Sequence, residues 1–350
     1  MRRKADGTGM EFYIPSFETP FCDQREMMER PFFSLAKKKR SNPIDYTSPD
    51  GKVTVFVAAT PEYGMATIWD ADILIYCASI INSMKKRRVN DIPQTLRVSP
   101  YDLLKSINRV ASGRGYELLA AALDRLQSTS VKTSIRAGSR FETTFSWLDS
   151  WKTEIDPASG KSRGIAITLS KWFYDGVMMS GGLLSIDNGY FDIDGGRERW
   201  LYRVARKHAG GAGADGFAIS MPTLFDKSGA EGVYRRFKFE LLAITRRNSL
   251  PGYALDIEWT RREPLIRFTK RSALVDAIGC HEAPKQTPPN RIDVSTETMT
   301  AMRVRYPWLK IDDLHHQYMR SPPSSVVTHG HDVAFRLFIE QANAMSETAT

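Results

Sequence analysis

The apolar positions of this chain show helical spacing followed by strand-like spacing, and this succession occurs twice. Between residues 99 and 127 they recur at helical spacing in two short segments, and from 131 to 169 the chain becomes strand-like, rich in Thr and aromatic side chains. Between 221 and 268 the same order returns, with two helical segments before two strand-like ones. Each repeat therefore predicts a short helix, a second helix and a β-hairpin.

The helices of the first repeat carry clear local signals. Ser99 predicts the N-cap of a short helix and Pro100 its first position. A second helix is expected over residues 116–127. Its buried face would contain Tyr116, Leu119, Leu123 and Leu126. Opposite that face lie Arg114, Ala121 and Arg125. This pattern suits a helix in the major groove, because small residues let the backbone approach while Arg reaches phosphates or guanine edges.

A hairpin is predicted after these helices. Strand-like segments flank the loop 156–164, which is rich in Gly, Ser and Pro. Lys161 and Arg163 lie in this loop, so we expect a basic hairpin tip, or wing. Lys132, in the strand-like segment before it, is a further candidate DNA contact.

The helix predicted over residues 230–248 is the most informative element of the second repeat. Its apolar face contains Val233, Phe237, Leu241 and Ile244. The candidate DNA contacts outside that face are Arg235, Arg236, Lys238 and Arg246. The following hairpin would carry Arg261 and Arg262 at its tip. The second repeat thus also predicts a recognition helix beside a basic wing.

These patterns predict an α+β fold with two tandem winged-helix domains, a flexible N-terminal arm and a helical C-terminal tail. The expected divisions are an arm at 1–50, winged-helix domains at 51–179 and 180–279, and a linker with a helical segment at 280–350. The arm has no lasting periodicity. The tail helices, near 296–319 and 332–344, have few apolar residues, so we expect each to dock elsewhere or stay partly disordered.

Positive charge is concentrated in the repeats. The whole chain has a net charge of +9. Residues 85–140 contain twelve Lys and Arg against four acids, and residues 197–247 contain eleven against five, so the two windows carry +8 and +6 and the remainder is negative. This distribution is typical of a polyanion-binding surface. The basic run at 37–40 is either a DNA-contacting arm or, more simply, a solvated charge run.

Signals for catalysis, a metal or a cofactor are weak. The glycine clusters at 181–182 and 210–213 match neither a phosphate-binding loop nor a dinucleotide fingerprint, and the three cysteines form no CxxC pair. The residues that remain as candidates for a DNA-cutting centre are Asp187, Asp192, Asp194, Tyr202 and Tyr234. We expect no enzyme activity, no metal and no cofactor, with a DNA-nicking enzyme as the alternative of another class.

Two long strings resemble the replication initiator protein A family of bacterial plasmids: MERPFFSLAK at 28–37 and EYGMATIWDADILI at 62–75. Similarity continues at 115–126 and in RWLYRVARKH at 199–208, and together it covers about residues 25–270. The resemblance implies binding of double-stranded origin DNA at repeated sites, local opening of the duplex and copy control. It also implies that the helices at 116–127 and 230–248 are the recognition helices.

The resemblance further implies partners: a host replication initiator, a helicase and a second copy of the chain. A transcriptional repressor with the same DNA contacts is the alternative within the class. No apolar run reaches the roughly 18–20 residues needed to span a bilayer, and the N-terminal MRRK is not followed by the apolar core of a signal peptide. We therefore expect a cytoplasmic protein without a membrane partner.

Overall fold

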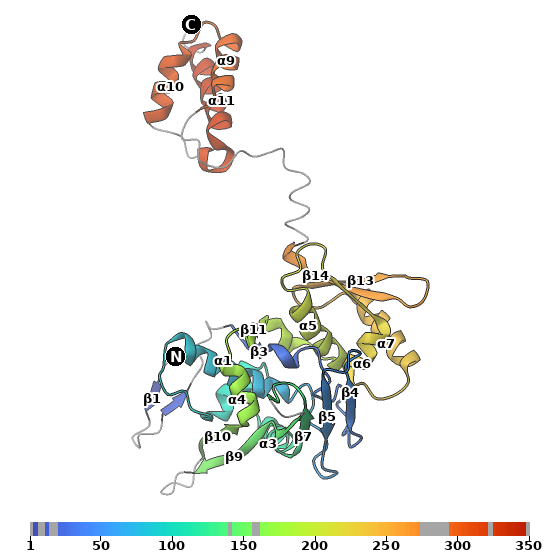
Figure 1. The fold of residues 1–350 in the computed structure, drawn as a ribbon. Coiled ribbons are helices and arrows are strands. Elements are labelled where there is room, and N and C mark those ends of the chain that lie inside the picture. The colour runs from blue at the N-terminus through green and yellow to red at the C-terminus, as the bar shows by residue number, and fades with distance from the viewer. Residues whose placement is uncertain are drawn as a thin grey trace. The chain divides into compact units, whose positions relative to one another are not determined.

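A computed structural model describes residues 3–5, 11–13, 20–138, 142–155, 162–273, 294–320 and 325–347. The chain mixes helices and strands and divides into two compact units, Met1–Ile278 and Gly279–Thr350 (Figure 1). Among the described residues, none of the helices combines the length and the apolar content that crossing a membrane requires.

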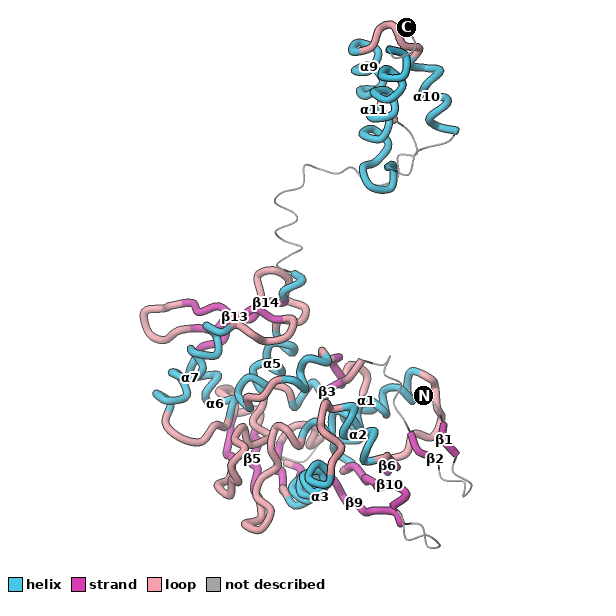
Figure 2. Tube along the Cα trace, turned by 180° about the vertical axis from the view of Figure 1, so that it is seen from behind, coloured by secondary structure: helices cyan, strands magenta, loops and turns pink. Residues whose placement is uncertain are grey.

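The first unit contains the same order of six elements twice. The first set consists of α1 (Ala71–Lys86), β6 (Thr95–Val98), α2 (Pro100–Ser106), α3 (Gly113–Ser128), β9 (Leu148–Ile155) and β10 (Ser162–Leu169). The second consists of α5 (Gly196–His208), β12 (Phe217–Ser220), α6 (Met221–Ser228), α7 (Tyr234–Arg247), β13 (Tyr253–Glu258) and β14 (Leu265–Lys270). Figure 2 shows both sets from behind.

The two sets also share their strand order. The three-stranded sheets run β6-β10-β9 and β12-β14-β13, and every pairing is antiparallel. In each, the strand that precedes the helix pair therefore pairs with the last strand of the hairpin. This pairing connects helix pair and hairpin into one small fold, so the predicted repetition of helices and hairpins is confirmed in the arrangement of the strands.

Local capping explains where the helices begin and end. Ser99 accepts a hydrogen bond from the Asp102 amide at the start of α2, as predicted, and Ser112 does the same for Gly115. The Ser112 cap moves the start of α3 before residue 116. The helix α7 begins later than predicted, because Gly232 has a φ of +101° that a helix cannot contain.

A four-stranded antiparallel sheet takes two strands from the chain before α1 and two from an insertion between α3 and β9. Its strands are β4 (Ile44–Thr47), β5 (Thr54–Ala58), β7 (Ser130–Thr133) and β8 (Thr143–Ser146), in the order β4-β5-β7-β8. Alternate side chains of β4 are buried, including Ile44 and Tyr46. Two further strands, β1 (Arg3–Ala5) and β2 (Glu11–Tyr13), pair with each other.

Residues 20–50 contribute side chains to the core, so the flexible arm expected over 1–50 is wrong for this part. Strand β3 (Cys22–Gln24) pairs with β11 (Leu183–Ser185), and a 3-10 turn at Arg25–Met27 follows. Side chains at irregular spacing are then buried: Met27, Met28, Phe32 and Phe33. Because they anchor an extended, non-periodic segment, no helical or strand period reveals them.

One continuous core serves both sets of elements. It joins Leu103 and Leu123 of the first set to Leu224, Phe237 and Leu241 of the second. The connecting segment contains α4 (Lys171–Met178) and a 3-10 turn at Asn188–Asp192. The expected division at 179/180 stays a prediction.

The C-terminal unit has a core of its own, which corrects the expectation that its helices must dock elsewhere. It consists of α9 (Thr296–Arg305), α10 (Ile311–Arg320) and α11 (Ser325–Glu347). The core contains Val294, Met299, Met302, Tyr306, Ile311, Tyr318, Ala334, Phe335 and Ile339. A few large aromatic side chains shared among three helices supply the burial that each helix lacks alone.

Candidate nucleic-acid interface

The helix α7 divides its side chains between core and solvent. Phe237, Leu241 and Ile244 are buried, as the apolar period predicted, whereas Val233 lies before the helix and is exposed. Arg235 and Arg246 are exposed on the opposite face. Within the described part of the chain, neither of these guanidinium groups forms an ion pair. Both are therefore available to an anionic partner.

The other two predicted cations of α7 already have partners. Arg236 forms an exposed pair with Glu240 one turn later, at 2.9 Å. Exposed pairs of this kind contribute only about 0–1 kcal/mol, so a phosphate can compete for Arg236. Lys238 instead binds Glu263 at 2.6 Å and is only partly exposed.

Glu263 fixes the hairpin loop against α7. Its carboxylate accepts hydrogen bonds from Lys238 and, at 2.9 Å, from the Tyr234 hydroxyl. These two donors hold the pKa of Glu263 below its ordinary value. The predicted tip residues Arg261 and Arg262 lie in this loop and are exposed. Glu263 thus holds the loop against the helix, and we call the exposed residues of the two elements the α7 surface: Arg235, Phe239, Arg246, Arg261 and Arg262.

The first set of elements offers fewer available cations. Arg114 is exposed but binds Glu117 one turn later, at 2.9 Å. Lys132 lies on β7 of the inserted sheet, where it binds Glu142 at 2.6 Å. Arg163 lies on β10, and Lys161 falls outside the described residues.

Arg125 has a structural contact instead. Its Nε and Nη2 each donate to a carboxylate oxygen of buried Asp70 at 2.8 Å, and this hydrogen-bonded pairing raises the pKa of Arg125. The helical wheel placed Arg125 opposite the apolar stripe, but Asp70 covers that side of the helix. We therefore leave Arg125 out of the proposed interface.

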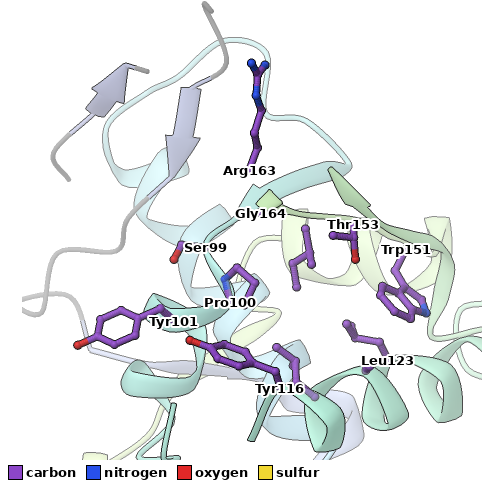
Figure 3. Close-up of a pocket in the computed structure, with 12 residues that line it drawn as sticks. Ser99, Pro100, Tyr101, Tyr116, Leu123, Trp151, Thr153, Arg163 and Gly164 are labelled. Carbon is purple, nitrogen blue, oxygen red and sulfur yellow. The ribbon is translucent and has the colours of Figure 1, made fainter. Parts of the chain in front are cut away.

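A groove between α2, α3 and the hairpin β9–β10 was not foreseen from the sequence. It encloses about 480 Å³ and is lined by Tyr101, Tyr116, Trp151 and Arg163, among others (Figure 3). Tyr116 was expected in the buried stripe, yet it is half-exposed at the edge of this groove. No sequence period could reveal this, because a stripe at helical spacing does not show where the neighbouring hairpin ends.

The basic run at 37–40 has structural contacts. The Lys39 ammonium donates to the Glu62 carbonyl, and buried Arg40 donates to the Gly229 carbonyl at the end of α6. A solvated run and a DNA-contacting arm both fail to describe Arg40. The hydrogen bond from Arg40 connects the N-terminal segment to the second set of elements.

Among the candidates for a DNA-cutting centre, Tyr202, Asp187 and Asp192 have structural contacts, whereas Asp194 is exposed. Tyr202 is buried, its hydroxyl accepts the Asp187 amide at 2.6 Å, and burial raises its pKa. Asp187 caps the turn at Gly189, and Asp192 binds Asn108. In the described part of the chain, no group of three or more His, Cys, Asp or Glu side chains could hold a metal ion.

Comparison with known proteins gives the family. The model of the replication initiator protein A family matches residues 22–255. A putative replication protein of Wigglesworthia glossinidia brevipalpis is 33% identical over 256 residues, covering 72% of this chain and 89% of that protein. A selenomethionine structure of domains 2 and 3 of RctB is similar with a TM-score of 0.48 and 14% identity, covering 67% of this chain and 94% of that one. A second structure of these domains has a TM-score of 0.45 and 13% identity, with coverages of 69% and 96%. Since the family model matches more than half of the chain, this protein belongs to the replication initiator protein A family.

Proposed function

We propose that this protein binds the origin of a plasmid specifically, helps to open the duplex there and recruits host replication proteins. The observation that carries the proposal is the α7 surface, where two exposed arginines without ion pairs lie beside a basic hairpin loop, in a chain of a replication initiator family. Exposed cations on a helix and an adjacent hairpin fit the phosphates and base edges of duplex DNA.

We further propose that each set of six elements is a winged-helix unit. The order helix, strand, helix, helix, strand, strand and the matching strand orders support this. In that arrangement α3 and α7 are the recognition helices and the two hairpins are the wings. Two connected units can engage successive grooves, because the first contact makes the second intramolecular.

The two units are proposed to contribute unequally. Arg114 is paired with Glu117 and Arg125 with buried Asp70, whereas Arg235 and Arg246 have no ion pair among the described residues. Freeing a paired arginine for a phosphate removes an existing contact, which lowers the net gain. The second unit should therefore supply most of the affinity.

The first test is binding of the purified protein to the origin fragment of its own plasmid and to a scrambled fragment of equal length, over a salt series. A preference above about 10³ with a steep salt dependence supports specific origin binding. Equal binding to both fragments contradicts it. Permanganate reactivity of thymines beside the bound site then separates an initiator, which opens the duplex, from a repressor, which does not.

We also propose that the protein acts without its own enzymatic activity, in the cytoplasm where plasmid DNA lies, with a second copy and a host initiator and helicase as partners. The structural positions of Tyr202 and Asp187 favour a non-enzymatic role. Incubation with supercoiled origin plasmid and Mg²⁺ tests this point. A nicked product would establish the nicking enzyme instead.

A further inference from the structure

Phe239 is exposed in the middle of the α7 surface. Its exposed fraction is 72%, whereas Phe237, on the opposite face of the same helix, is exposed by only 1%. An aromatic ring carries a large apolar area, and leaving it in water forgoes the stabilisation that burial would give. The described residues leave most of this ring uncovered, so the ring is available to a partner.

The neighbours of Phe239 restrict what that partner can be. Arg235 lies one turn before it and Arg246 two turns after it, and at about 100° per residue all three fall on one narrow face. The half-buried Ala243 lies on the same face. An apolar protein surface or a lipid tail placed on Phe239 would also have to cover two guanidinium groups without counter-charges. A polyanion with an apolar group between its charges can pair with both guanidinium groups and contact the ring of Phe239.

Duplex DNA presents such a group in the major groove. Of the groups that the bases present there, the C5-methyl group of thymine is apolar, and the other groups that distinguish the bases are hydrogen-bond donors and acceptors. We infer that Phe239 contacts the C5-methyl group of a thymine and makes that position of the recognition site specific for thymine. The inference rests on the proposed function, because it requires that α7 lies in the major groove.

The spacing of the residues places this thymine within the site. Four helical residues rise about 6 Å and seven about 10.5 Å. With about 3.4 Å between successive base pairs, the thymine lies about two base pairs from the contact of Arg235 and about three from that of Arg246 on the other side. Arg235 and Arg246 then supply contacts on both sides of the apolar one.

The test removes one methyl group at a time. Duplexes are first selected from a random library with the full-length protein, and each thymine of the best duplex is then replaced singly by 2′-deoxyuridine, which differs only in lacking the methyl group. Wild-type protein should bind one of these duplexes about three- to tenfold more weakly, as expected for the loss of one buried methyl contact. Phe239→Ala should not distinguish thymine from deoxyuridine at that position.

Two further variants make the result specific. Phe239→Leu keeps an apolar side chain and should retain the preference for thymine, which also covers the case in which Phe239→Ala binds too weakly to measure. Val304→Ala alters an exposed apolar residue of the C-terminal unit and should behave as wild type at every position.

The outcomes separate this inference from the function on which it rests. If the library is enriched but no deoxyuridine weakens wild type, or if Phe239→Ala retains the same sensitivity, the inference is overturned while specific DNA binding stands. If no sequence is enriched, the proposed function fails and the inference fails with it.

Discussion

Arg203 on α5 donates two hydrogen bonds to the carboxylate of Asp23, from Nε to Oδ2 at 2.6 Å and from Nη2 to Oδ1 at 3.1 Å. Both side chains are buried, and 180 residues separate them in the sequence. The pair joins strand β3 to α5, the helix that begins the second set of elements. Both residues lie within the range 22–255 that the family model matches.

Removing Asp23 should destabilise the first compact unit strongly. Asp23→Ala leaves the buried guanidinium of Arg203 without its partner, and breaking a buried pair in this way costs about 3–5 kcal/mol. Urea unfolding monitored by tryptophan fluorescence measures the change. Glu117→Ala is the control, since it removes only the exposed pair with Arg114 and should cost less than about 1 kcal/mol. Equal effects of the two variants would show that the Asp23 contact is not stabilising.

Arg125 and Arg114 provide a second comparison, on one helix. Arg125→Ala should lower the free energy of unfolding by about 2–4 kcal/mol, because it leaves buried Asp70 unpaired, and Arg114→Ala should leave it nearly unchanged. Under conditions where both variants are folded, Arg125→Ala should bind origin DNA like wild type. A loss of affinity beyond its folded fraction would return Arg125 to the interface.

On the α7 surface, Arg235→Ala and Arg246→Ala should each weaken specific binding by about 1–3 kcal/mol without changing stability. A residue that contacts a phosphate should also reduce the salt slope by about one, whereas one that reads a base should relax specificity at one position. Fluorescence anisotropy over a salt series distinguishes these effects. Arg303→Ala, in the C-terminal unit, is the matched control. Unchanged affinity in both variants would place the recognition face elsewhere.

Acid should weaken the fold through Glu29. Burial alone would raise its pKa, but hydrogen bonds from His208 at 2.7 Å, Lys207 at 2.6 Å and Lys227 outweigh burial and hold the pKa well below its ordinary value. Because the folded pKa lies below the unfolded value of about 4.3, the stabilisation is present at neutral pH and is lost progressively as the pH falls below about 5.

The substitution Glu29→Gln tests this. It should be less stable than wild type at pH 7, because Lys207 and Lys227 lose a buried counter-charge. It should also lose less stability than wild type between about pH 5 and pH 3. Urea midpoints at several pH values measure both effects. Parallel pH profiles for the two proteins would contradict the assignment.

The C-terminal unit should unfold independently. Phe335→Ala removes a large side chain from its core and should cost about 3–5 kcal/mol there, while leaving the urea midpoint of the first unit unchanged. Truncation after residue 278 gives the helical circular dichroism of the first unit alone, and the difference from the full-length chain reports the C-terminal unit. A shift of the first unit's midpoint in either chain would show coupling between the two.

Sequence predicted most reliably what local physics determines. Helix α2 was predicted with its N-terminus, since the capping residue Ser99, Pro100 and the apolar period agree there. The role of Arg125 could not be predicted, because its partner Asp70 lies 55 residues away and a helical wheel contains no tertiary neighbours. Phe239 was overlooked for the opposite reason, since an exposed aromatic residue on a basic face matches neither a core nor a charge pattern.

The buried N-terminal segment also determines how early the core of the first compact unit can be completed during synthesis on the ribosome. Asp23 and Glu29 emerge first, but their partners Arg203, Lys207 and His208 follow about 180 residues later. Until α5 is synthesised, the side chains of residues 22–33 lack part of the surface that covers them, and such non-local contacts slow folding. The first residues of the core to be made are thus among the last to find their partners.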